Sequence, residues 1–248
     1  IGSLIDAHPD AAVSHELDAM GLLQKRFSRR SILALIADNT NAFREHGRFW
    51  NSFAYVVPNQ AHGVSGAPKL YGDKKGDWAA RRFAEDPDLL ARCRKTMGAR
   101  CPWILVVRHP LDNIATMSLR KGRFYDRLRI ATTSSSEFRK QMAAAQAEEK
   151  IPSQALDEMI DDYQSLCEAI EAMKREVAPE DWREVNYESF TAQPETQLKE
   201  LLHYLGLSAS EAFVGDAVSI VHRSARRSRD DLQWEPQQQE RVQSIIDR

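Results

Sequence analysis

The stretch from Trp103 to Gly122, WILVVRHPLDNIATMSLRKG, limits the possible folds of this chain most. It opens with five apolar residues, Trp103 to Val107, which end at a short polar turn. Such a run is typical of a strand buried on both faces of a parallel sheet. Pro110 suits the first position of a helix, which we predict to run to about Gly122. A strand that leads through a short turn into a helix favours anion binding, because free backbone N–H groups and the helix dipole point at the turn.

Length and charge narrow the classes of protein to which the chain can belong. Its 248 residues, of which 42% are hydrophobic, allow one large domain or two small ones with a substantial core. The net charge is −2, with 34 basic and 36 acidic residues, which argues against a general nucleic-acid or membrane-surface binder. No apolar stretch approaches the ~18 residues of a membrane span. We therefore expect neither a nucleic-acid partner nor a membrane span.

The three cysteines, Cys93, Cys101 and Cys167, show no metal-ligand spacing and are odd in number. Reduced thiols in a reducing compartment are the simplest interpretation, which predicts a cytoplasmic protein. We predict no metal site.

Apolar periodicity predicts strands that alternate with helices along the chain. Short strands are expected at residues 11–14, 53–57, 69–71, 103–107 and 182–186. Helices are expected after Ser28, after Pro152-Ser153 and over Pro194–Leu205, the last stopped by Gly206. This alternation indicates an α/β domain with a mainly parallel sheet. No internal repeat or linker divides the chain, so we predict a single domain over residues 1–248.

The pattern Arg108-x7-Thr116-x3-Arg120, directly after the predicted strand, resembles the 3′-phosphate site of sulfotransferases that use 3′-phosphoadenosine 5′-phosphosulfate (PAPS). Four more stretches resemble blocks of this family in the same order, namely DAHPDAAVSHE, GDKKG, VNYESF and ARRSRDDLQWEP. The likeness is greatest to the bacterial sulfotransferases and their tyrosylprotein-sulfotransferase relatives. It implies a P-loop-NTPase-like three-layer sandwich, in which helices flank a central, mainly parallel sheet.

One block of the family does not appear in the sequence. The 5′-phosphosulfate loop, a Pro-Arg-Ser-Gly-Thr-like turn after the first strand, would precede the first residues, and the chain begins with Ile-Gly-Ser rather than Met. We therefore expect a sulfotransferase domain that is truncated at its N-terminus, with the first strand and this loop upstream.

The resemblance implies in-line transfer of a sulfonate group from PAPS to a hydroxyl or amine acceptor, with 3′-phosphoadenosine 5′-phosphate (PAP) as the product and no metal. Glu16 would be the base, because a glutamate is deprotonated at neutral pH and can accept the acceptor's proton. His15 is the alternative base. Lys74 would stabilise charge on the bridging oxygen, while Lys75 is expected to point elsewhere if the segment is extended.

Arg108, Thr116 and Arg120 would bind the 3′-phosphate of the donor by this resemblance. Thr116 and Arg120 are four residues apart and so share a helix face. Asp112, in the first turn of the same helix, is interpreted as a complement to the helix dipole rather than as a ligand.

The resemblance also implies donor contacts outside this helix. Tyr187 would lie near the nucleotide, and Ser228 with Arg227 would close over the 3′-phosphate. The sequence does not decide among Arg226, Arg227 and Arg229 for this contact.

Two other functions remain open at this stage, a P-loop kinase-like phosphotransferase and a non-catalytic nucleotide-binding module. The acceptor would be a small-molecule, carbohydrate or lipid hydroxyl, and the loops at residues 46–66 and 123–150 are candidates for its binding walls. A homodimer, or a place within a larger chain, also stays open.

Overall fold

The computed structural model describes residues 1–50, 53–60, 67–98, 100–122 and 156–247, with residues 137, 140, 141 and 144 between the last two ranges. The chain divides into two compact units. The first holds Ile1–Val106 and Ala169–Arg223, and the second holds Val107–Glu168 and Ser224–Arg248. The prediction of a single domain over residues 1–248 stays a prediction.

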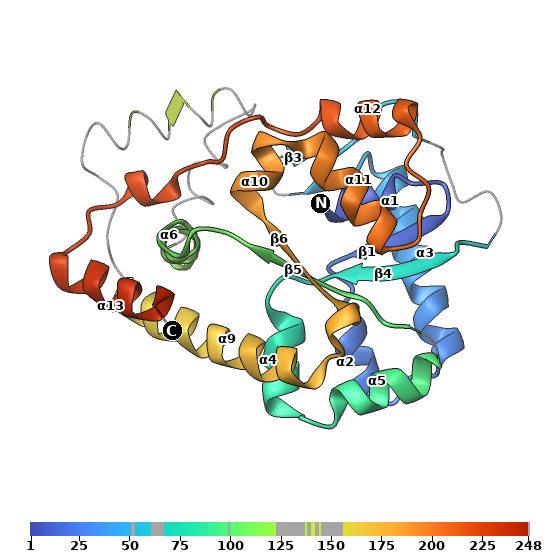
Figure 1. Ribbon diagram of the computed structural model, residues 1–248, viewed down its shortest axis with the longest axis horizontal. Helices are drawn as coiled ribbons and strands as arrows, with labels where there is room; N and C mark the ends of the chain where they lie inside the picture. The colour runs from blue at the N-terminus through green and yellow to red at the C-terminus, as the bar shows by residue number, and fades with distance from the viewer. Residues whose placement is uncertain are drawn as a thin grey trace. The chain divides into compact units, whose positions relative to one another are not determined.

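Strands and helices alternate through the first unit (Figure 1). Its strands are β1 (Ala11–His15), β2 (Phe49–Trp50), β3 (Phe53–Ala54), β4 (Leu70–Lys74), β5 (Trp103–Val107, whose last residue belongs to the second unit) and β6 (Trp182–Asn186). Its helices are α1 (Gly2–Asp6), α2 (Ala19–Gln24), α3 (Arg29–Glu45), α4 (Trp78–Glu85), α5 (Leu89–Met97), α10 (Tyr187–Ala192), α11 (Pro194–Tyr204), α12 (Glu211–Ser219) and the 3₁₀ turn η1 (Pro179–Asp181).

The described part of the second unit consists mainly of helices. These are α6 (Pro110–Lys121), the 3₁₀ turn η2 (Ser228–Asp231), α13 (Pro236–Ile246) and the first part of α9 (Leu156–Glu176), in which the boundary between the units falls after Glu168. Apolar side chains of α6, α9 and α13 share one core, which includes Ile114, Ile160 and Val242. Arg241 of α13 joins this packing through ion pairs to Asp157 and Asp161 of α9, at 2.6 and 2.5 Å.

The described strands pair two by two. Strands β1 and β4 are parallel, with Ala11 opposite Leu70 and His15 opposite Lys74. Strands β2 and β3 pair antiparallel, and β5 pairs with β6. The parallel pair places the C-terminal ends of β1 and β4 side by side, so that Glu16 and Lys74 meet at one edge.

Strand β1 separates two apolar layers of the first unit. Ala11 and Val13 pack into the cluster that α1, α11 and α12 share. Ala12, which points to the opposite face, packs into the cluster of α2, α3 and α5. Neighbouring residues of β4, Leu70 and Tyr71, divide between the same two clusters. The strands of this unit thus lie between helical layers, which agrees with the predicted α/β sandwich.

A buried ion group lies beneath β1. Asp6, at the end of α1, forms ion pairs with Arg44 and Arg48, and all three side chains are nearly inaccessible to solvent. The Val13 backbone N–H donates to Oδ1 of Asp6 at 2.8 Å. This group ties α1, α3 and β1 together from the inside.

Strand β5 and helix α6 follow the predicted boundaries, but β5 is not buried on both faces. Val106 is 45% exposed, and none of the last three strand residues packs into an apolar cluster of the described residues. The prediction of full burial is therefore wrong, because a short apolar run does not show how far the covering layers extend along it.

Other predicted features are only partly open to comparison. The strand expected over residues 53–57 is limited to Phe53–Ala54, and β4 runs three residues further than expected, to Lys74. The predicted acceptor wall at residues 123–150 lies outside the described residues apart from four positions, as does the Pro152-Ser153 helix start. Within the described ranges, no helix is both long and apolar enough to cross a bilayer.

Candidate functional site

Glu16 directly follows β1 and continues its pairing with β4 by one residue. Its backbone N–H donates to the Lys74 carbonyl oxygen at 2.8 Å. The backbone then turns sharply, and Glu16 adopts a left-handed conformation with φ 61°. Asp18, two residues later, also has a positive φ of 70°. The turn therefore lifts the Glu16 side chain away from the strand at the C-terminal end of β1.

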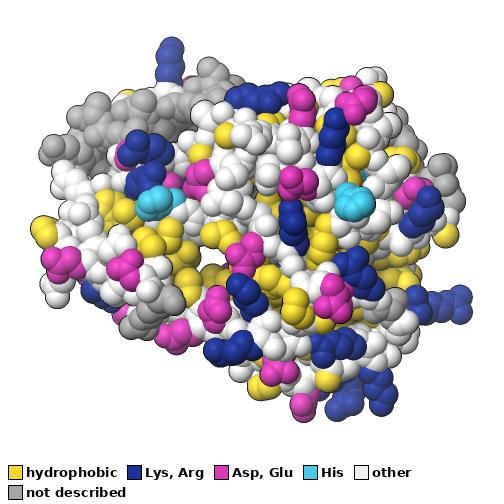
Figure 2. Space-filling model, viewed as in Figure 1, with side chains coloured by type: hydrophobic (Ala, Val, Ile, Leu, Met, Phe, Trp, Pro, Cys, Tyr) yellow, Lys and Arg dark blue, Asp and Glu magenta, His cyan; other side chains and the backbone are white. Residues whose placement is uncertain are grey.

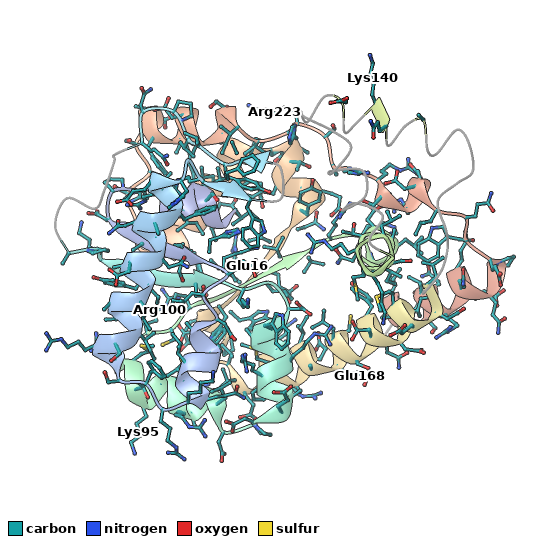
Figure 3. The ribbon with its side chains drawn as sticks, turned by 180° about the vertical axis from the view of Figure 1, so that it is seen from behind. Glu16, Lys95, Arg100, Lys140, Glu168 and Arg223 are labelled. Atoms are coloured by element: carbon teal, nitrogen blue, oxygen red, sulfur yellow. The ribbon has the colours of Figure 1, made fainter. Side chains whose placement is uncertain are left out.

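Two lysines surround the Glu16 carboxylate, and Figure 3 labels Glu16 from the side opposite to Figure 1. Nζ of Lys74 forms an ion pair with Oε1, and Nζ of Lys75 lies 3.6 Å from Oε2. Lys75 also donates to the Glu16 carbonyl oxygen at 3.3 Å. The structure thus brings Glu16 and Lys74 together. The expectation that Lys75 points elsewhere is wrong, because β4 ends at Lys74 and strand alternation no longer applies.

Two aspartates fix the turn that carries Glu16. Asp73 of β4 accepts from Oγ of Ser14 and from the Ala19 backbone N–H, both at 2.7 Å. Asp18 caps α2 by accepting from the Gly21 N–H at 3.1 Å and forms an ion pair with Arg82 of α4. Sequence analysis did not single out either aspartate, although an Asp next to a helix start is a usual capping signal.

The ring of His15 packs between aromatic side chains beside Glu16. It stacks on Phe43 with centroids 4.4 Å apart and meets the edge of Trp50 at 4.9 Å. Its Nε2 atom is buried and has no hydrogen-bond partner among the described residues. Burial lowers the pKa of His15 below its usual value, and the charge of Lys74 adds to this effect. The imidazole is thus held in its neutral form next to the Glu16 carboxylate.

The second unit brings together Arg108, Thr116 and Ser228, which we call the arginine clamp. Nη1 of Arg108 donates to Oγ1 of Thr116 at 3.2 Å, across the first two turns of α6. Nη2 donates to Oγ of Ser228 at 3.0 Å and to the Arg226 carbonyl oxygen at 2.6 Å. Ser228 is buried, with 1% of its surface exposed. The structure thus brings together three of the residues named from the sequence, Arg108, Thr116 and Ser228.

Asp112 stabilises the clamp through two hydrogen bonds. Its buried Oδ1 accepts from the Arg229 backbone N–H at 2.8 Å and so joins η2 to the start of α6. Its carbonyl oxygen accepts from the Thr116 hydroxyl at 2.8 Å, which leaves the Thr116 oxygen turned toward Arg108. The interpretation of Asp112 as a dipole complement missed this tether, because its partner lies 117 residues away.

Two of the predicted donor contacts in the second unit, Arg120 and Arg227, lie outside the clamp. Arg120 is exposed on α6, one turn beyond Thr116, and no hydrogen bond or ion pair joins it to the clamp residues described above. Arg227 is exposed and pairs with Asp230 at 3.1 Å. Tyr187 belongs to the first unit, where it begins α10 directly after β6. The roles of these residues toward the donor stay predictions.

The sequence did not decide which of three arginines contacts the donor, and in the structure these arginines have different partners. Arg226 forms an ion pair with the buried Asp231 at 2.7 Å and contributes its carbonyl oxygen to the clamp. Burial raises the pKa of Asp231, and the Arg226 charge opposes this effect. Arg229 places its Nε atom 3.9 Å from Asp112.

The clamp has the donors that a phosphate group needs. A guanidinium offers a planar, permanently charged fork, and hydroxyls add neutral donors that can rotate toward anionic oxygens. The Ser228 hydroxyl accepts from Arg108 and keeps its own proton for donation. Within the described ranges, no three His, Cys, Asp or Glu side chains come together in a metal-binding arrangement.

Comparisons with known proteins agree with the resemblance that the sequence shows. The model of the Sulfotransferase family matches residues 102–211, which include β5, Arg108, Thr116 and Tyr187. The chain is similar to the solved sulfotransferase domain from the curacin biosynthetic pathway, with 14% identity and a TM-score of 0.50 over 99% of this chain and 90% of that one. This likeness confirms the sulfotransferase fold.

A second solved structure, the sulfotransferase domain from the Synechococcus PCC 7002 olefin synthase, has 14% identity and a TM-score of 0.47, over 99% of this chain and 87% of that one. No curated protein matches the chain.

Proposed function

We propose, from the match of residues 102–211 to the sulfotransferase family, that this chain transfers a sulfonate group from PAPS to a hydroxyl or amine acceptor and releases PAP. The observation that carries the choice of donor is the convergence of Ser228 and Thr116 on Arg108, at 3.0 and 3.2 Å. Within the second unit, this cluster has the charge and the donors suited to a phosphate monoester.

The arginine clamp is assigned to the 3′-phosphate of the donor. A 3′-phosphate oxygen would accept from the Arg108 guanidinium and from the rotated Ser228 hydroxyl. Asp112 and Arg226 contribute to binding indirectly, because they hold η2 against α6. The same group distinguishes PAP from 5′-AMP, which has no 3′-phosphate.

Glu16 and Lys74 are assigned to the transfer step. The acceptor oxygen forms a bond to sulfur while the bond between sulfur and the bridging phosphate oxygen breaks. Glu16 takes the acceptor proton, and the Lys74 ammonium stabilises the negative charge on the departing oxygen. The Lys74 side chain is 43% exposed, so its ammonium can leave Glu16 for the donor while Lys75 stays near the carboxylate.

The acceptor class remains a hydroxyl of a small molecule, a carbohydrate or a lipid. On the face that Figure 2 shows, the coloured Lys and Arg side chains alternate with Asp and Glu rather than forming a basic patch. A single-sign basic surface is what a polyanionic acceptor would favour, so we propose an acceptor of low charge. The reduced cysteines expected from the sequence suit a cytoplasmic enzyme.

Transfer of radiolabelled sulfonate from PAPS to a panel of phenols, sugars and lipid alcohols tests the proposal. Wild type should label at least one acceptor class, and Glu16→Gln should lower kcat by about 10²–10⁴-fold while PAP affinity is unchanged. Glu211→Gln, which also removes a carboxylate paired with a lysine, should leave turnover unchanged.

Binding of PAP, followed by calorimetry, tests the donor site separately. Arg108→Ala should weaken PAP binding by about tenfold to a hundredfold, because it removes hydrogen bonds from a charged donor. Lys121→Ala, on the same helix but paired with Glu158, is the matched control. A protein that binds PAP but transfers nothing to any acceptor would instead be a nucleotide-binding module, and transfer from ATP would favour a phosphotransferase.

A further inference from the structure

Two thiols lie close together in the first unit, in a part of the molecule that the proposed transfer reaction does not use. The sulfur atoms of Cys93 and Cys101 are 4.0 Å apart, and the Cys93 thiol donates to the Cys101 sulfur. Cys93 is buried on α5, whereas Cys101 is half-buried two residues before β5.

Neighbouring contacts hold the backbone beside Cys101 in place. Arg100, labelled in Figure 3, donates to Oδ1 of Asp181 at 2.7 Å and to the carbonyl oxygens of Glu180 and Tyr204 at 2.6 and 3.0 Å. These bonds fix the backbone next to Cys101. Since an S–S bond is about 2.05 Å long, the two sulfurs have to approach each other by about 2 Å before they can bond.

A cavity of about 250 Å³ lies beside the two cysteines. It is lined by Leu90, Cys93, Arg94, Cys101, Trp103, Val177 and Asp181. The cavity can admit part of a small molecule to the thiols, and Arg94 offers a positive charge for a carboxylate. The structure therefore combines a dithiol with a route by which a reagent reaches it.

The two thiols differ in acidity. The hydrogen bond from Cys93 lowers the pKa of Cys101 to about 7, and the charges of Arg94 and Arg29 act in the same direction. The same hydrogen bond and burial raise the pKa of Cys93. Because the thiolate is the nucleophile, Cys101 would react first and Cys93 second.

We propose that Cys93 and Cys101 form a thiol–disulfide exchange pair that reduces a low-molecular-weight disulfide of the glutathione class. The Cys101 thiolate attacks one sulfur of the disulfide; a Cys101–glutathione bond forms, the original S–S bond breaks, and one glutathione leaves and takes up a proton. Cys93 then loses its proton to water and attacks the Cys101 sulfur. The Cys93–Cys101 bond forms and the second glutathione leaves, so the protein is oxidised by two electrons as glutathione disulfide is reduced.

Incubation of the reduced protein with glutathione disulfide, followed by mass spectrometry of its peptides, tests the pair. Wild type should acquire a Cys93–Cys101 cross-link and lose two thiols per chain, while Cys167 stays reduced. Cys93→Ser, which keeps a hydrogen-bond donor beside Cys101, should accumulate a stable glutathione adduct on Cys101. Cys101→Ser should leave Cys93 reduced over the same time.

A pulse of iodoacetamide on the wild-type protein gives a second measurement that needs no variant. Cys101 should be alkylated several-fold faster than Cys167 at neutral pH, with a midpoint in its pH profile near 7. The proposal is overturned if Cys101 reacts no faster than Cys167, or if wild type stops at a mixed disulfide without forming the cross-link.

Discussion

Nη2 of Arg108 lies 3.0 Å from Oγ of Ser228, although 120 residues separate them in the sequence. Arg108 enters the clamp from the end of β5, and Ser228 enters it from η2. The clamp therefore forms only when η2 is docked on α6, which the tether from Asp112 to the Arg229 N–H maintains. If the clamp binds the donor as proposed, donor binding and the folding of this short segment are linked.

Removal of the Ser228 hydroxyl should weaken PAP binding selectively. One hydrogen bond to a charged phosphate contributes about 1.5–3 kcal/mol, so Ser228→Ala should raise the Kd for PAP roughly tenfold or more. Calorimetry with 5′-AMP should show no change, because that nucleotide has no 3′-phosphate. Ser219→Ala, which removes an exposed hydroxyl from α12, is the control. An equal loss of affinity for both nucleotides would show that Ser228 acts on the fold of η2 rather than on the 3′-phosphate.

Substitution of the two lysines around Glu16 should affect kcat to different extents. Lys74→Met removes the charge assigned to the departing oxygen, so kcat should fall about 10²-fold or more. Lys75→Met removes only the weaker contact, 3.6 Å from Oε2, and should have a much smaller effect on kcat. Steady-state assays with one acceptor from the labelled panel measure both. If Lys75→Met causes the larger loss, the two assignments must be exchanged.

His15 should titrate below its usual range. Burial, the main cause, lowers the folded-state pKa of His15 below the 6.5 of a free imidazole. Above the unfolded value both states are neutral and stability is constant. Below it the unfolded chain binds the proton first, so this contribution to stability falls as the pH drops from 6.5 toward the folded pKa.

NMR titration of the His15 ring proton gives the direct measurement, with His15→Gln to assign the resonance. A midpoint below 6.5 is expected. A midpoint at or above that value would mean that the ring is more open to water than its contacts with Phe43 and Trp50 indicate.

The buried ion group should control the stability of the first unit. Asp6→Asn leaves Arg44 and Arg48 buried without their shared carboxylate, and breaking a buried pair in this way costs about 3–5 kcal/mol. Asp10→Asn breaks an exposed pair with Lys69 and should have a much smaller effect on the free energy of unfolding. Urea unfolding of both variants, followed by circular dichroism, measures the free energies. Similar values would show that solvent reaches the Asp6 group.

Local signals were enough to predict the centre of the fold. Pro102 and Pro110 bracket the apolar run, and the structure gives β5 and α6 nearly the predicted bounds. The end of β4 was missed because Gly72 and Asp73 are typical turn residues. Parallel pairing with β1, which places Gly72 opposite Val13, outweighs that preference. Such pairing depends on residues 59 positions away and leaves no local signal.

Of the candidate site, too, some residues could be named from the sequence, while the roles of others could not be predicted. Thr116 and Ser228 were both identified only through the family resemblance, and helical spacing added only that Thr116 shares a face of α6 with Arg120. The roles of Arg226 and Asp112 could not be predicted. Arg226 joins the clamp through its carbonyl oxygen, which accepts from Arg108. Asp112 joins it through a carboxylate oxygen that accepts from the distant Arg229 backbone N–H. Lys75 was misplaced because its direction depends on the residue at which β4 ends.

The left-handed backbone at Glu16 lowers the stability of the fold, although the carboxylate at this position is the one proposed to act as the base. A side chain in this conformation, with φ 61°, costs about 1–2 kcal/mol that glycine would avoid. Glycine loses part of that gain through the greater freedom of the unfolded chain. Selection for thermal resistance alone would therefore favour glycine at this residue and remove the carboxylate. A library screened only for folding should drift toward glycine, and the proposed role of Glu16 predicts that such variants do not transfer sulfonate.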